Sequence, residues 1–150
     1  MSESPQKPVF LPSGPVLQNQ PSSFAEPTRG TTTWHTLLSA PNTPTDSLTT
    51  GIATCPPNGS LALHRHKQAE IYYILSGTGE VEIEGERQRV VKDTVVWIPG
   101  DAEHGVFCGE QSELQWLYVF PESKMENVVY RFRDESEYNR PTHRGVASKL

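Results

Sequence analysis

The sequence predicts an all-β protein, and three observations carry that prediction. Residues 71–120 are rich in Val, Ile, Tyr and Trp, which favour strands. Short segments of this kind recur about every ten residues with Gly, Pro, Asn and Asp between them, a spacing typical of a β-sandwich or barrel. Within them, Val81 and Ile83 alternate with three glutamates, as a strand with one buried face should. A chain of 150 residues is long enough for one domain with one core.

Composition divides the chain into three parts. Ten of the 13 prolines precede residue 61, and six of them fall within residues 1–30. Because proline breaks helices and favours extended backbone, residues 1–30 are expected to form an irregular, Pro-rich arm. Residues 31–132 are expected to form the β-structure, and residues 133–150 a polar tail.

Apolar alternation and turn residues place the strands along the chain. Gly77 and Gly79 are expected to lie in one turn, and residues 56–59 in another. Leu61 and His64, on one strand, are expected to face opposite sides. The expected strands are 31–38, 51–55, 61–66, 70–75, 80–84, 87–91, 94–98, 104–108, 114–120 and 128–132.

Four side chains predict a metal site. His64 and His66 are two residues apart, so both can face the inside of a sheet or barrel. A short connection brings Glu70 onto the next strand, and His104 can arrive from a later hairpin. Three neutral imidazoles and a carboxylate are the donors expected of a mononuclear site for a first-row metal. The alternative is that these are unrelated polar residues on the surface, but their position among strand-like segments weakens it.

Charge and apolar patterning exclude several classes of protein. The net charge is −5, and residues 61–120 hold ten acidic against five basic side chains, so a nucleic acid is not an expected partner. No apolar run approaches membrane-spanning length, and the N-terminus has no apolar signal core, so neither a membrane protein nor a secreted one is expected. Cys55 and Cys108 are expected to be free thiols.

The last three residues, Ser148-Lys149-Leu150, match a peroxisomal targeting signal that an import receptor reads. The residues before them are polar and include a Pro and a Gly, which suits an exposed end. The sequence therefore predicts a peroxisomal location, and otherwise a cytoplasmic one.

The ligand residues resemble the first motif of the cupin family, G-x5-H-x-H-x3,4-E-x6-G. His64, His66, Glu70 and Gly77 match it, and Gly59 lies one residue closer to the first His than the motif requires. The chain is therefore identified as similar to a small single-domain cupin over roughly residues 50–120.

The second cupin motif, G-x5-P-x-G-x2-H-x3-N, is matched in part. Pro99 and His104 are present. Asp101 replaces the internal Gly, Cys108 replaces the final Asn, and Asp93 stands where the first Gly would be. All four ligand positions are intact, so these departures concern turn geometry and the pocket lining.

The resemblance implies a jelly-roll barrel that holds a divalent metal near its open end. It also implies a homodimer in which an N-terminal segment packs on the partner, a role that residues 1–30 would suit. The alternative for this arm is disorder, since its hydrophobicity is low. Fe(II) is the favoured metal, with Zn, Mn or Ni as alternatives, because these ions compete for the same donors.

Tyr72 and Glu70 are the candidate catalytic residues. Tyr72 lies two positions after Glu70 and is expected to share its inward face with Ile74. A phenol beside a metal can coordinate it, act as a base or orient a substrate. In cupins that resemble lyases cleaving dimethylsulfoniopropionate, a Tyr at this spacing serves as the base. The alternative is a core aromatic residue whose hydroxyl is satisfied at the rim.

Other residues have simpler interpretations. Cys108 is expected to face the same way as His104, either near the metal or as a small buried residue. Trp97, Trp116 and Tyr118 are expected to wall the barrel as core residues rather than as an aromatic cage.

The donor set leaves open coordination positions, which allow three functions. The favoured one is an Fe(II) oxidoreductase, a dioxygenase acting on a small enolic, phenolic or polyketide-like metabolite. The second is a redox-neutral isomerase, cyclase or lyase that uses Zn or Mn as a Lewis acid. The third is a non-catalytic cupin that binds a small ligand, since fold alone does not choose among these.

Overall fold

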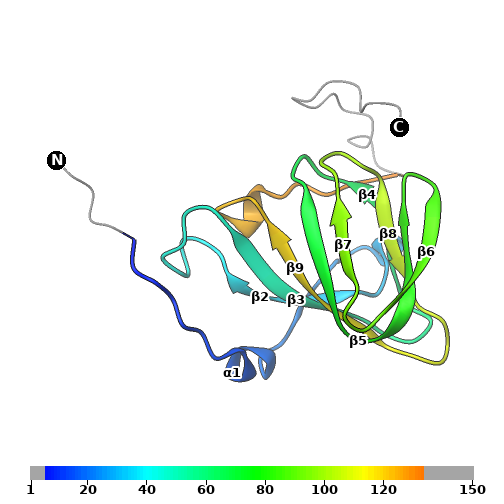
Figure 1. Ribbon diagram of the computed structural model, residues 1–150, viewed down its shortest axis with the longest axis horizontal. Coiled ribbons are helices and arrows are strands. Elements are labelled where there is room, and N and C mark those ends of the chain that lie inside the picture. The colour runs from blue at the N-terminus through cyan, green and yellow to red at the C-terminus, as the bar shows by residue number, and fades with distance from the viewer. Residues whose placement is uncertain (1–5, 134–150) are drawn as a thin grey trace.

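The protein folds into two curled β-sheets that share one long strand (Figure 1). The computed structural model describes residues 6–133. One sheet holds β1, β2, β3, β9, β7 and the first half of β5, and the other holds β10, β4, β8, β6 and the second half of β5. The all-β prediction is therefore confirmed. The elements are α1 (Ser13–Leu17), β1 (Ser22–Ser23), η1 (Pro27–Arg29), β2 (Thr33–Leu38), β3 (Thr49–Cys55), β4 (Ser60–Arg65), β5 (Glu70–Ile83), β6 (Glu86–Val91), β7 (Val95–Ile98), β8 (His104–Phe107), β9 (Leu114–Phe120), η2 (Met125–Asn127) and β10 (Arg131–Phe132).

The turn expected at Gly77 and Gly79 is wrong, because the long strand β5 runs through both residues. Both glycines lie inside the strand, which runs without interruption through 14 residues. Gly77 has a φ of 81°, and a side chain there would collide with the backbone carbonyl of Glu113, so only glycine fits. The pairing register with β9 also shifts between Ile74 and Ser76. The glycine therefore bends one strand from the first sheet into the second.

Strand β4 contains a second irregularity. Because of it, Leu61 and His64 do not face opposite sides of the strand as expected. The register between β4 and β8 shifts between Leu61 and His64. Both side chains are consequently buried, although they are three residues apart. The extra residue of the bulge lets the strand bury Leu61 in the core and still aim His64 inward.

The core fills the space between the sheets. Every second residue of β9 is buried, from Leu114 through Trp116 and Tyr118 to Phe120. On β5, Tyr72 and Ile74 point the same way and are 1% and 0% exposed, so their expected shared inward face is confirmed. Such alternation is what a strand with one buried face requires.

Part of the N-terminal arm packs on the barrel of its own chain. The Phe24 ring lies 4.8 Å from Trp34, 5.5 Å from Tyr130 and 5.2 Å from Phe132, measured between ring centroids. Residues 6–12 instead extend away from the barrel (Figure 1), and Phe10 is 91% exposed. Ser148-Lys149-Leu150 lies outside the described residues. Within residues 6–133, no helix is long and apolar enough to cross a membrane.

Candidate metal centre

Three of the predicted ligands meet inside the barrel. His64 lies on β4 opposite His104, the first residue of β8, and His66 follows the end of β4. The ring centroids are 4.2 Å apart for His64 and His104, 4.9 Å for His66 and His104, and 5.5 Å for His64 and His66. One ring nitrogen from each lies within 4.8 Å of the others, and all three side chains are at most 1% exposed. These three histidines can hold one metal ion.

Backbone carbonyls fix the tautomer of each ring. Nδ1 of His64 lies 2.8 Å from the carbonyl oxygen of Ala62, that of His66 2.9 Å from Gln68, and that of His104 2.9 Å from Ala102. Because a carbonyl oxygen only accepts, each Nδ1 carries the hydrogen and donates it. In the neutral rings, Nε2 is therefore left with a free lone pair. Such second contacts of metal-binding histidines orient the rings toward the ion.

Glu70, the first residue of β5, brings a carboxylate to the same point. Its Oε1 lies 3.3 Å from Nε2 of His66 and 3.3 Å from Nε2 of His104. Among the described residues, these atoms and Nε2 of His64 are buried without a hydrogen-bond partner. Buried acceptor atoms that converge in this way are costly unless a cation, either a metal ion or a proton on one of the rings, lies between them. The donor set therefore fits a divalent metal.

The electrostatics keep His64 and Glu70 in the protonation states that a metal requires. Burial, with His104 and His66 close by, holds the pKa of the His64 ring well below its usual value, so the ring is neutral. Burial works against ionisation of Glu70. Its contacts with His104 and His66 outweigh burial and lower the pKa of the carboxyl group, so Glu70 is ionised.

Aromatic side chains enclose a narrow cavity beside Glu70. Its volume is about 20 Å³. Tyr72 lies in its wall as expected, with its ring centroid 6.3 Å from that of His104. Burial and the charge of Glu70 raise the pKa of Tyr72 well above its usual value, so without a bound cation the phenol holds its proton. The lining residues are Phe24, Thr32, Trp34, Ala53, Leu61, Glu70, Tyr72, Trp116, Tyr118, Met125 and Tyr130.

Tyr130 is a residue of the site that the sequence did not reveal. It is half-buried, and its ring centroid lies 5.0 Å from that of His64 and 5.4 Å from that of His66. Burial and Glu70 raise the pKa of its hydroxyl as well. The sequence signals a strand around Tyr130. Its proximity to the histidines follows from the antiparallel pairing of β10 with β4, which no local pattern reveals.

Cys108 and Trp97 lie away from the histidine cluster. Cys108 follows the far end of β8, where its Sγ lies 3.6 Å from the carbonyl oxygen of Cys55. Burial and the contact with Cys108 raise the pKa of Cys55 to about 12, so its thiol is not ionised. Trp97 is 66% exposed on the outer face of β7, so its expected place in the barrel wall is wrong. Trp116 and Tyr118 are buried, as expected, and they also line the cavity.

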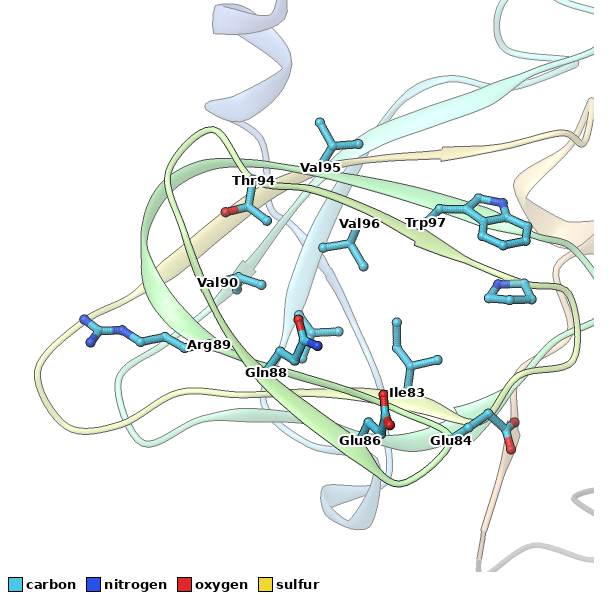
Figure 2. Close-up of a pocket in the computed structure, with 12 residues that line it drawn as sticks. Ile83, Glu84, Glu86, Gln88, Arg89, Val90, Thr94, Val95, Val96 and Trp97 are labelled. Carbon is cyan, nitrogen blue, oxygen red and sulfur yellow. The ribbon is translucent and has the colours of Figure 1, made fainter. Parts of the chain in front are cut away.

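A larger cleft of about 500 Å³ lies apart from the histidines, between β6 and β7. Figure 2 shows apolar side chains such as Val96 and Ile83 on its floor, Arg89 at one end, and Glu84 and Trp97 at the other. None of the four predicted ligands lines this cleft.

The fold and the site define a small β-barrel with an internal histidine cluster that can hold one metal. The family model described as "Cupin domain" matches residues 51–120. Dimethylsulfoniopropionate lyase DddW of Ruegeria pomeroyi is 35% identical over 111 residues, which cover 74% of this chain and 72% of the lyase. The chain belongs to the cupin family, as a small single-domain member.

Solved structures share the fold. The polyketide cyclase RemF of Streptomyces resistomycificus superposes with a TM-score of 0.69 at 23% identity, covering 88% of each chain. A predicted oxalate decarboxylase of Thermotoga maritima gives 0.62 at 23% identity, covering 71% of this chain and 96% of that one. At this level of identity the likeness concerns the fold, and it confirms the expected jelly-roll architecture.

Proposed function

We propose that this protein is a metal-dependent lyase that cleaves a small carboxylic acid bearing a sulfonium group, of the dimethylsulfoniopropionate class. Three observations support this function: the buried donor set, the aromatic cavity beside it, and the similarity to a lyase named for that substrate. The dioxygenase function expected from the sequence depended on the donor set alone. The same donors serve redox-neutral chemistry equally well.

We expect His64, His66, His104 and Glu70 to hold one divalent ion, with Fe(II) favoured and Zn, Mn or Ni as alternatives. Such an ion would act as a Lewis acid that polarises the substrate carboxylate and favours the deprotonated form of a nearby phenol.

The aromatic cavity is the observation that carries the choice of substrate. Six of its lining side chains are Phe, Trp or Tyr, and its charged member is the carboxylate of Glu70. Aromatic faces attract cations through their quadrupole, and methylated onium groups are recognised in this way. The aromatic faces and the carboxylate of Glu70 both suit a sulfonium group. The cavity volume of about 20 Å³ is, however, smaller than such a substrate. Side chains of its wall must therefore move when the substrate enters.

The reaction we propose is a β-elimination. Tyr72, as the phenolate, takes the proton from the carbon next to the substrate carboxylate. The electron pair of that C–H bond forms the carbon–carbon double bond, and the carbon–sulfur bond breaks with its pair leaving on sulfur. The products are a neutral sulfide, an unsaturated carboxylate and the proton on Tyr72. No atom is oxidised or reduced overall.

Metal-loaded protein incubated with dimethylsulfoniopropionate is expected to release dimethyl sulfide, measured by gas chromatography, at equal rates in air and under argon. Equal rates are expected because the elimination consumes no oxygen. Acrylate should appear in a one-to-one ratio with the sulfide. Absence of sulfide in both atmospheres, or turnover that consumes oxygen, would contradict the proposal.

We also propose that the protein is a homodimer. Separately, we propose that Ser148-Lys149-Leu150 directs it to peroxisomes. A fluorescent protein fused ahead of the full chain is expected to collect in peroxisomes of a eukaryotic cell, and the same fusion lacking these three residues in the cytosol. Equal distributions of the two fusions, seen by microscopy, would contradict this assignment.

A further inference from the structure

We propose that Asp101 and Arg131 are a positioning pair that fixes β10, and with it Tyr130, over the histidine cluster. The consequence for substrate binding depends on the proposed function, since it concerns the wall of the cavity that would receive the sulfonium group. The structural part stands independently of that function.

Asp101 joins three parts of the site through three different groups. Its backbone N–H donates to the carbonyl oxygen of His66 over 2.8 Å. Its carbonyl oxygen accepts from Nη1 of Arg65 over 3.2 Å. Its carboxylate Oδ1 lies 2.5 Å from Nη2 of Arg131. The residue therefore ties the segment before β8 to the end of β4 and to β10.

The backbone conformation at Asp101 favours glycine, so an aspartate at this position points to a role for its side chain. Its φ is 64°, in the left-handed region that glycine adopts without cost, and the cupin motif has glycine there. An aspartate strains this conformation relative to glycine. The side chain offsets that cost through a contact that glycine cannot make, the ion pair with Arg131.

Strand β10 has only two residues, so side-chain contacts such as this ion pair and the packing of Phe24 on Phe132 help to hold it. Its two residues pair with β4 as Arg131 with Arg65 and Phe132 with His64. Side chains of Asp101 and Arg131 are 5% and 8% exposed, so the pair is buried. Removing Asp101 would take this ion-pair partner from the buried Arg131, which disfavours the closed position of the strand.

Tyr130 immediately precedes Arg131, so the pair sets where its ring lies. That ring stands 5.0 Å from His64 and closes the cavity beside Glu70. A displaced β10 would therefore widen the cavity without removing any predicted metal ligand. Neither Asp101 nor Arg131 lines the cavity, and neither is a predicted metal ligand, so we expect the pair to act by holding Tyr130.

The test compares Asp101→Gly with the wild type by hydrogen exchange read by mass spectrometry. Glycine suits the backbone at this position, so the variant removes the ion pair without straining the turn. Exchange within residues 128–133 is expected to rise about tenfold or more, while that of β5 and β9 stays unchanged. Metal content should remain at the wild-type level, and Arg131→Lys should show an intermediate increase.

A matched control is the neighbouring pair of Arg133 and Glu103. The Arg133 side chain is 57% exposed, against 8% for that of Arg131, so water can solvate its charge more readily. Arg133→Gln is expected to change exchange in residues 128–133 much less than Asp101→Gly does. Unchanged protection in Asp101→Gly would overturn the proposal. So would loss of protection throughout the barrel, because the pair would then support the whole fold rather than one strand.

With substrate, Asp101→Gly is expected to raise KM about tenfold, with kcat within about threefold of the wild type, because binding in the cavity is weakened. A lower kcat at unchanged KM would contradict the positioning role. If no lyase activity exists, the exchange experiment still decides whether the pair holds β10, so the two proposals fail separately.

Discussion

His66→Ala is expected to reduce bound metal from about one ion per chain to less than about a tenth of that, and to abolish lyase activity, because affinity depends on the full ligand set. The barrel should remain folded, because the change also removes a buried Nε2 that has no hydrogen-bond partner among the described residues. Elemental analysis after gel filtration measures the metal, and far-UV circular dichroism the fold.

The control for this change is His35→Ala. His35 is half-buried on β2, and its Nε2 lies 2.8 Å from the carbonyl oxygen of Asn19 rather than near the cluster. Metal content should stay at the wild-type level in this variant. Equal metal content in wild type, His66→Ala and His35→Ala would mean that the assigned residues do not bind the ion.

Tyr72→Phe is expected to lower kcat by a factor of about 100 to 1000, because it removes the oxygen that takes the proton in the proposed elimination and leaves the ring in place. KM should change by less than about threefold, since the cavity wall is preserved. Steady-state kinetics of dimethyl sulfide release, on samples of equal metal content, measure both constants.

The matched control is Tyr73→Phe on the same strand. Tyr73 points to the opposite face, is 37% exposed, and its hydroxyl donates to Asp93 over 3.0 Å. Its kinetic constants should stay at wild-type values. Equal losses in the two variants, or wild-type kcat in Tyr72→Phe, would show that Tyr72 does not move the proton.

Spacing along the sequence predicted much of the site because strand geometry is simple. Side chains two apart on a strand share a face, so His64 and His66 were expected together and the structure brings them together. The same rule placed Tyr72 beside Glu70. Glu70 and His104 come from other strands, and their convergence was expected because four suitable donors lie among strand-like segments, a set that the cupin motifs also contain.

The features of the fold and site that were not predicted depend on long-range packing, which local sequence patterns do not encode. The bulge in β4 buries both Leu61 and His64 against strict alternation, and a glycine that bends a strand resembles a glycine in a turn. Tyr130 joins the site through pairing between distant segments, a choice made by the packing of the whole chain. Trp97 was expected to wall the barrel as a core residue, yet it lies on an outer strand face.

X-ray absorption spectroscopy of the metal-loaded wild-type protein tests the donor set most directly. We predict one ion per chain, with nitrogen and oxygen ligands at about 2.0–2.2 Å and outer-shell scattering from three imidazole rings. A sulfur ligand at about 2.3 Å, or an ion surrounded by water oxygens alone, would contradict it.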